Sequence, residues 1–343
     1  MRAIVRAGRY RLWLVLVLIG YGDFAMVGAQ PPGESGGTEL YAVRWIDQFA
    51  ASRDLGKARS IGQRVLGFLL GEKETCLVKP VALLAGDSGR LWIADQGAHA
   101  LMWVDPETRQ IKMLEAVDRQ GLPSPAGVCF GAGDEIFLSD SRRNRIFRQQ
   151  GAEALRILND TLTLQQPTGI AYDPFNAQLW VAETAAHRLA VLDRAGNRVH
   201  TVGRRGRAPG EFNFPTYLWI DRAGNVYVVD AMNFRVQILS PAGEVLSVFG
   251  ASGDASGYFA RPRGIATDTL GHVYVVDGLF HTVQVFDRAG NFLTHFGKQG
   301  RGAGEFWLPA GIYIDAANRI YVADTYNSRI QMFQLVEGAE DEP

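Results

Sequence analysis

The sequence contains little cysteine. Only Cys76 and Cys129 occur among its 343 residues, and neither belongs to a Cys-x-x-Cys-His motif. The chain therefore carries no c-type haem attached through its own cysteines. From the sequence, two interpretations of the pair stay open: a disulfide between them, or a buried and unreactive Cys129.

The chain also has little net charge. Its 35 Lys and Arg residues oppose 36 Asp and Glu residues. Without residues 1–29, which hold four arginines and one aspartate, 31 basic and 35 acidic residues remain and the net charge is −4. A mildly acidic chain is a poor match for nucleic acid as its main partner. No polybasic tail is present that would dock on an anionic membrane.

The N-terminal apolar run is too short for a comfortable membrane span. Leu12–Ile19 follows four arginines, and Asp23 interrupts the apolar stretch. The small residues Val27-Gly28-Ala29 then offer a cleavage site. This order predicts a secretory signal peptide cleaved before Gln30, with an uncleaved anchor as the alternative. We therefore expect a secreted or periplasmic protein without stable membrane insertion after cleavage.

A sixfold internal repeat is the most regular feature that the sequence does have. Each copy opens on a proline, continues with a short apolar strand and closes a second strand with an acid. The opening prolines are Pro80, Pro125, Pro167, Pro215, Pro262 and Pro309. The closing acids are Asp95, Asp140, Glu183, Asp230, Asp277 and Asp324. Successive copies are 42 to 48 residues apart, and this period with all-strand content predicts a β-propeller.

We expect an all-β, six-bladed propeller whose blades each have four antiparallel strands. The last repeat ends after its third strand at Leu335, and Val43–Phe49 is similar to the fourth strands of other repeats. This N-terminal strand is predicted to complete blade six, which closes the ring and leaves no unpaired edge. Apolar residues at helical spacing predict one short helix over Ser60–Leu70, inserted before the first repeat.

The predicted organisation has four parts. Residues 1–29 are a signal peptide, residues 30–41 a flexible linker rich in Gly and Pro, residues 42–336 the propeller, and residues 337–343 an acidic tail. The composition of the linker and the tail is typical of segments that pack little against a core.

The repeat resembles a known family. The copies follow the pattern Pro-x-Gly-Ile-Ala-x-Asp, then Tyr-Val-x-Asp, then Asn-x-Arg-Val-Gln-Val-Phe, and Pro262–Asp268 matches its first part at every fixed position. This pattern is similar to the NHL repeat, and six copies resemble the six-bladed NHL propellers of secreted bacterial proteins. The resemblance covers Val43–Gln334 and is looser in the first repeat, where Ala82 replaces Gly. It implies the fold specifically and the function only weakly.

The acids that close the second strands are predicted to be structural. In four repeats an arginine follows five residues later: Arg145, Arg188, Arg235 and Arg329. A ring of functional carboxylates is the alternative. Repetition in nearly every blade favours acids that accept hydrogen bonds at their own turns or pair with arginine, because a catalytic site needs one asymmetric group of residues.

Three histidines, His99, His187 and His281, occupy the fourth position after the acid in alternate repeats. Three imidazoles suggest a shared metal ion. These turns lie well away from the axis of a propeller, however, so we expect the three rings to be too far apart to share one ion.

Three long crossovers between repeats share the pattern Gly-x-x-Gly-x-x-x-Gly-x-Phe-x-x-Pro. The glycines suggest a phosphate-binding loop, but no helix N-terminus follows them. Phe212, Phe259 and Phe306 are instead predicted to pack between blades.

An enzyme is the alternative function. Amidating lyases with an NHL propeller hold zinc through histidines near the channel, and lactonase-type propellers hold calcium through acidic and amide side chains. The six inner strands of this chain contain no histidine. The inner-strand acids sit at the turn end of their strands, at Asp173, Asp221, Asp268 and Asp315. We therefore expect no cofactor, and a metal-dependent propeller enzyme with a divalent ion in the channel stays the alternative.

The candidate binding residues are those in which the repeats differ. They lie around the opening prolines and the crossovers: Lys79, Tyr217, Arg261, Arg263, Arg205 and Arg207. In a chain of negative net charge, this local excess of cations is suited to an acidic protein segment or another anionic ligand. We predict a non-catalytic protein- or ligand-binding scaffold. The resemblance implies an envelope or electron-transfer complex as one setting for the partner.

Overall fold

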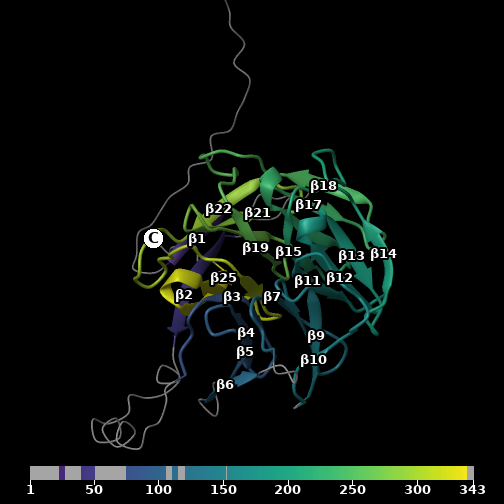
Figure 1. Cartoon of the computed structure of the whole chain (residues 1–343). Coiled ribbons are helices and arrows are strands. Elements are labelled where there is room, and N and C mark those ends of the chain that lie inside the picture. Colours follow the sequence, from purple (N-terminus) through teal and green to yellow (C-terminus); the bar gives the residue numbers. More distant parts are fainter. Residues whose placement is uncertain are drawn as a thin grey trace, which may run out of the picture.

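The protein is a six-bladed β-propeller. A computed structural model describes residues 23–27, 40–50, 75–105, 110–114, 120–151 and 153–337. Six antiparallel sheets surround one axis, and the inner strands β3, β7, β11, β15 and β19 lie closest to it (Figure 1). The helix expected over Ser60–Leu70 lies outside the described residues. In the described part of the chain, no helix is long and apolar enough to cross a membrane.

Blades one to five each use one continuous stretch of chain. Blade one contains β3 (Pro80–Ala85), β4 (Leu91–Asp95), β5 (Ala100–Asp105) and β6 (Gln110–Leu114). Blade two contains β7 (Pro125–Phe130), β8 (Glu135–Asp140), β9 (Arg145–Gln150) and β10 (Arg156–Ile157). Blade three contains β11 (Pro167–Asp173), β12 (Gln178–Glu183), β13 (Arg188–Leu192) and β14 (Arg198–Val202). Blade four contains β15 (Pro215–Ile220), β16 (Val226–Asp230), β17 (Arg235–Leu239) and β18 (Val245–Phe249). Blade five contains β19 (Pro262–Thr267), β20 (Val273–Asp277), β21 (Thr282–Phe286) and β22 (Phe292–Phe296).

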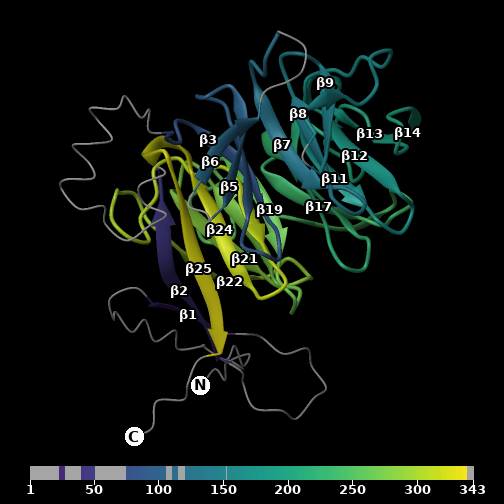
Figure 2. The same ribbon diagram turned by 90° about the horizontal axis from the view of Figure 1, so that it is seen from below.

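Blade six joins the two ends of the chain. Its strands are β23 (Ile312–Ile314), β24 (Arg319–Asp324), β25 (Arg329–Glu337) and β2 (Leu40–Phe49). β2 pairs antiparallel with β25, so the predicted closing strand is confirmed. β1 (Asp23–Val27) adds a fifth strand outside β2 (Figure 2), and it falls within the segment expected to be a signal peptide.

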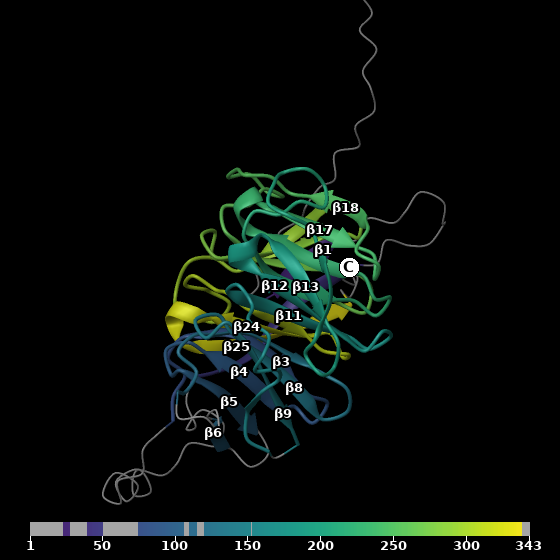
Figure 3. The same cartoon turned by 45° about the vertical axis from the view of Figure 1, so that its right-hand side comes forward.

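The closed ring places blade six beside blade one. Figure 3 shows the yellow strands β24 and β25 next to the blue strands β3 and β4. The Thr325 hydroxyl donates to the carbonyl oxygen of Pro80 at 2.8 Å, and the Ser328 hydroxyl donates to that of Val78 at 2.7 Å. The first repeat is thus tied directly to the last.

The acids that close the second strands are structural, as predicted. All six are fully buried. Asp277 accepts the backbone N–H groups of Ala260 and Arg261 from the preceding crossover and those of Leu279 and Phe280 from its own turn. Carboxylates satisfied in this way fix each turn to the crossover beside it.

Three of the four predicted acid–arginine pairs form. Arg188, Arg235 and Arg329 bind the acids five residues before them at 2.7 to 2.8 Å. Arg145 instead donates to the carbonyl oxygens of Asp160 and Leu162. Blade two therefore uses this arginine to hold a loop.

The turn between the second and third strands has one backbone form in every blade. The fourth residue after the acid has φ between 53° and 57°, in the left-handed region. These residues are His99, Asn144, His187, Phe234, His281 and Ser328. Because the form is common to all blades while the residue varies, the turn is imposed by the pairing of the strands and by the buried acid.

Two packing devices hold neighbouring blades together. A Cβ atom at Gly169 would lie 2.5 Å from the carbonyl oxygen of Thr216, so the inner strands of blades three and four approach too closely for any side chain at this position. The crossover phenylalanines Phe212, Phe259 and Phe306 are fully buried in clusters that span two blades each. This confirms the predicted role of the crossovers in packing.

Candidate functional site

The face that carries the crossovers and the second-to-third turns is named the top face here. Near the axis it brings together Lys79, Arg261, Arg263 and Tyr326, which we call the cationic rim. The Lys79 ammonium lies 5.9 Å from the ring centroid of Tyr326, whose side chain is 57% exposed. The charge of Arg263 is the main cause that lowers the pKa of Arg261, and the phenols of Tyr326 and Tyr217 act on the same guanidinium. Residues from blades one, five and six thus meet at one place.

Within the part of the chain that the structure describes, the cationic rim has no acidic counterpart. Among the described residues, no carboxylate forms an ion pair with Lys79, Arg261 or Arg263. By contrast, Arg235 and Arg329 on the same face are almost buried and are paired with acids. Like charges that lie side by side without compensation attract an anion.

Arg205 and Arg207 belong to a different part of the top face. Both are exposed on the crossover between blades three and four. Arg205 contributes to the lowered pKa of His187, and the carbonyl oxygen of Arg207 accepts from Arg235. No contact joins these two arginines to the cationic rim within the described residues.

Tyr217 does not point to solvent as an ordinary rim residue would. It replaces the glycine of its repeat on β15, and its hydroxyl donates to the carbonyl oxygen of Val81 at 3.2 Å. Val81 belongs to blade one, which lies opposite blade four in a ring of six. The phenol therefore crosses the axis and separates the cationic rim from the channel below.

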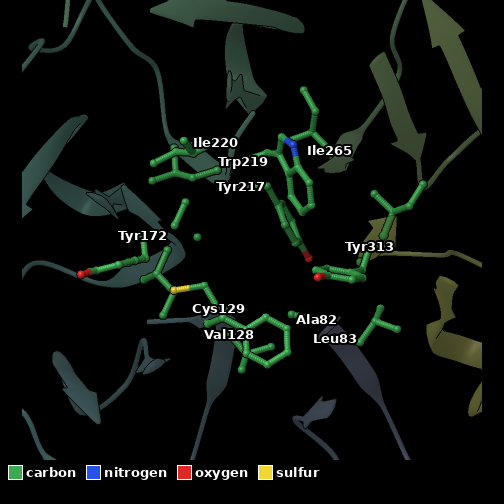
Figure 4. A pocket seen from close by; sticks show the side chains of 18 residues that line it. Ala82, Leu83, Val128, Cys129, Tyr172, Tyr217, Trp219, Ile220, Ile265 and Tyr313 are labelled. Carbon is green, nitrogen blue, oxygen red and sulfur yellow. The ribbon is translucent and has the colours of Figure 1, made fainter. Parts of the chain in front are cut away.

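The channel contains a cavity of about 150 Å³. Figure 4 shows Tyr217, Trp219 and Tyr313 on one side of it, and Cys129 and Tyr172 on the other. The rings of Trp219 and Tyr313 meet edge to face at 5.6 Å, and the Trp219 indole donates to the Thr267 hydroxyl at 2.9 Å. Trp219 and Tyr313 were not singled out from the sequence, although both stand where other repeats have a smaller residue.

The three histidines occupy separate junctions between blades. The Nδ1 atoms of His187 and His281 accept the backbone N–H groups of Phe214 and Leu308 at 3.1 and 3.0 Å. Burial lowers the pKa of both rings, which favours the neutral form that can accept. His99 Nδ1 donates to the carbonyl oxygen of Pro123 at 3.0 Å. Each ring thus links its own blade to the next crossover.

The inner-strand acids hold the turns that follow them. Asp221 accepts the backbone N–H groups of Ala223 and Asn225, and Asp268 accepts those of Leu270 and His272. In the described part of the chain, no three His, Cys, Asp or Glu side chains gather as a possible metal-binding group.

The two cysteines do not form a disulfide. Cys76 is exposed, whereas Cys129 lines the channel. Burial raises the pKa of the Cys129 thiol far above its usual range. A thiol that keeps its proton is a poor nucleophile. The structure therefore favours an unreactive Cys129, although its side chain is partly exposed to the channel and not fully buried.

Comparison with known proteins supports the same architecture. Residues 265–340 match a family model described as a 6-bladed beta-propeller. No curated protein sequence matches the chain. An auxiliary nutrient binding protein from Bacteroides thetaiotaomicron is similar in structure, with a TM-score of 0.60 and 15% identity over 77% of this chain and 71% of that one.

Two further solved structures have the same fold. An auxiliary nutrient binding protein from Bacteroides ovatus has a TM-score of 0.60 and 12% identity over 87% of this chain and 84% of that one. A catalytically inactive virginiamycin B lyase from Staphylococcus aureus, solved with quinupristin, has a TM-score of 0.56 and 16% identity over 75% and 95%. At such low identity, both binding proteins and a lyase share the architecture, and the chain is identified as a six-bladed β-propeller.

Proposed function

We propose that this propeller is a non-catalytic binding scaffold whose cationic rim receives an acidic segment of a protein partner. The observation that carries the proposal is the pair Arg261 and Arg263, which no carboxylate among the described residues compensates, with Lys79 over the ring of the exposed Tyr326 beside it. A rigid propeller face presents such a group without having to order it on binding. The auxiliary nutrient binding proteins of the same fold show that binding is one use of this architecture.

The double variant Arg261→Glu/Arg263→Glu is expected to weaken binding of an acidic peptide about tenfold or more, equal to ~1.4 kcal/mol or more. The reason is that two attractive charges become repulsive. The probe is a fluorescein-labelled decapeptide of alternating Glu and Ala, titrated by fluorescence anisotropy at low ionic strength. Screening by added salt is expected to weaken binding to the unaltered protein as well.

The matched control is Arg156→Glu/Arg222→Glu, which changes the net charge equally at two exposed arginines outside the rim. It is expected to keep most of the affinity. If both double variants lost the same share of their affinity for the peptide, net charge alone would attract it. That result would refute the cationic rim as the binding site. A protein captured from a native extract supports the proposal only if the rim variant no longer captures it and the control variant still does.

We further propose that the propeller works outside the cytoplasm, on the basis of the basic and apolar N-terminus and the small residues before Gln30. Fractionated native cells are expected to yield a protein whose intact mass begins at Gln30, in the periplasm or medium. A chain begun at residue 30 behind an initiator Met is expected to stay in the cytoplasm. A native protein that keeps Met1 and stays in the cytoplasm would contradict export.

A further inference from the structure

The cavity in the channel is placed to one side of the axis. Tyr217 and Trp219 of blade four fill the half of the channel toward blade five, and Tyr313 reaches in from blade six (Figure 4). The opposite wall comes from blades two and three, and four of the residues that line it there are small: Gly127, Cys129, Gly169 and Ala171. The void therefore exists because large side chains on one wall face small ones on the other.

The cavity is partly open to solvent, and most of its exposed lining lies toward one end. Six of the seven partly exposed lining residues stand at or next to the last positions of the inner strands: Cys129, Phe130, Tyr172, Trp219, Ile220 and Tyr313. The seventh is Tyr217, nearer the start of its strand. The six positions lie next to the turns between first and second strands, on the face opposite the cationic rim. A small molecule would therefore enter from that face, with Tyr217 across the other end.

Aromatic rings shape the cavity. Tyr313 meets Trp219 edge to face at 5.6 Å and Phe130 edge to face at 6.4 Å, and Phe130 in turn meets Trp92 at 5.5 Å. A cavity of about 150 Å³ has the size that holds one benzene-like molecule. A further ring can continue the edge-to-face contacts, each of which adds about 0.5–1.5 kcal/mol.

The Tyr313 hydroxyl points into this space. Figure 4 shows the Tyr313 hydroxyl directed toward the centre of the channel. Within the described residues it has no hydrogen-bond partner. Burial and the nearby Asp315 and Asp87 raise the pKa of Tyr313 well above its usual range, so the hydroxyl keeps its proton and acts as a donor. The Tyr172 hydroxyl points away from the cavity in the same view.

We infer that the channel binds a small, uncharged, single-ring molecule whose oxygen accepts a hydrogen bond from Tyr313, at a site separate from the cationic rim. The ring lies between Trp219 and the small residues of blades two and three. An anionic ligand is disfavoured because Asp315 and Asp87 stand close to the phenol. Phenol has the required size, an uncharged ring at neutral pH and one oxygen, so it serves as the probe.

The experiment compares phenol with toluene, which has the same shape without the oxygen, by titration calorimetry on the full chain. Phenol is expected to bind with a Kd of about 0.1–1 mM and toluene about five- to tenfold more weakly. Tyr313→Phe is expected to remove this preference and leave toluene within about twofold. The matched control Tyr172→Phe removes a hydroxyl that points elsewhere and is expected to change neither affinity.

A second variant tests the position of the ring. Cys129→Leu fills the small-residue wall and is expected to abolish binding of both probes, with folding verified by far-ultraviolet circular dichroism. Arg261→Glu/Arg263→Glu alters the opposite face and is expected to leave phenol binding unchanged, which separates this site from the proposed rim function. The inference is overturned if neither probe binds the unaltered protein, if Cys129→Leu still folds and binds both, or if Tyr313→Phe keeps the preference for phenol.

Discussion

Replacing Arg329 with methionine is expected to lower the free energy of unfolding by about 3–5 kcal/mol, because the change leaves a buried acid without its counter-charge. The Arg329 side chain is 7% exposed and pairs at 2.8 Å with Asp324, which is fully buried. Its other N–H groups donate to the Gln48 side chain at 2.6 Å and to the carbonyl oxygens of Arg301, Gly302 and Glu305. One side chain therefore joins the closing strand, the third strand and a crossover. Urea unfolding followed by tryptophan fluorescence measures the effect.

Arg204→Met is the matched control, since Arg204 pairs with Glu211 at a similar distance of 3.0 Å but is 83% exposed. This exposed pair is expected to contribute about 0–1 kcal/mol. The double variant Arg329→Met/Asp324→Asn removes the buried charge as well and is expected to recover part of the loss. Similar losses for Arg329→Met and Arg204→Met would refute the role assigned to burial.

Phe306→Ala is expected to cost about 3–5 kcal/mol of stability, the range for a large aromatic side chain removed from a core. Phe306 is fully buried, and its ring lies 6.4 Å from that of Phe296 and 5.8 Å from that of Phe333. It also covers Gly297, where a Cβ atom would lie 2.3 Å from the Phe306 ring. Removal leaves a cavity between blades five and six that these rigid neighbours cannot close. The same urea titration measures the change.

The control for this variant is Phe175→Ala, because Phe175 is 69% exposed on a turn of blade three. Removing this exposed ring is expected to change the free energy of unfolding by less than about 0.5 kcal/mol. If Phe306→Ala were equally mild, the crossover phenylalanines would not be the packing elements that the structure indicates, and another contact would have to hold these blades together.

The fold was predictable because every blade repeats the same residues at the same structural positions. The opening proline and the closing acid, Pro309 and Asp324 in the last copy, recur at nearly one spacing, and the buried acid needs the same turn in every copy. The closing strand was predictable because the last repeat lacks a fourth strand. Its third strand would have an unpaired edge unless a strand from elsewhere in the chain paired with it. The family model matches residues 265–340, where the repeats are most regular.

The site was predictable only in part. The departures from the repeat at Tyr217, Arg261 and Arg263 were singled out because a residue that breaks the pattern is not needed for the blade, and their role in binding stays a prediction. The direction of Tyr217 could not be predicted, since it depends on the distance across the ring to Val81. Tyr326 was missed because a turn residue that varies between repeats carries no signal until Lys79 of another blade is beside it.

Blade six also imposes an order of events on folding. The Trp45 indole donates to the Gln331 side chain, a contact between residues 286 positions apart in the chain. Contacts of such sequence separation slow folding, because the ends of the chain must meet before the contact is gained. β2 is thus expected to pair late, after the blades whose strands are neighbours in the sequence. Until then the chain has open strand edges at both ends, and these edges make the unclosed ring prone to aggregation.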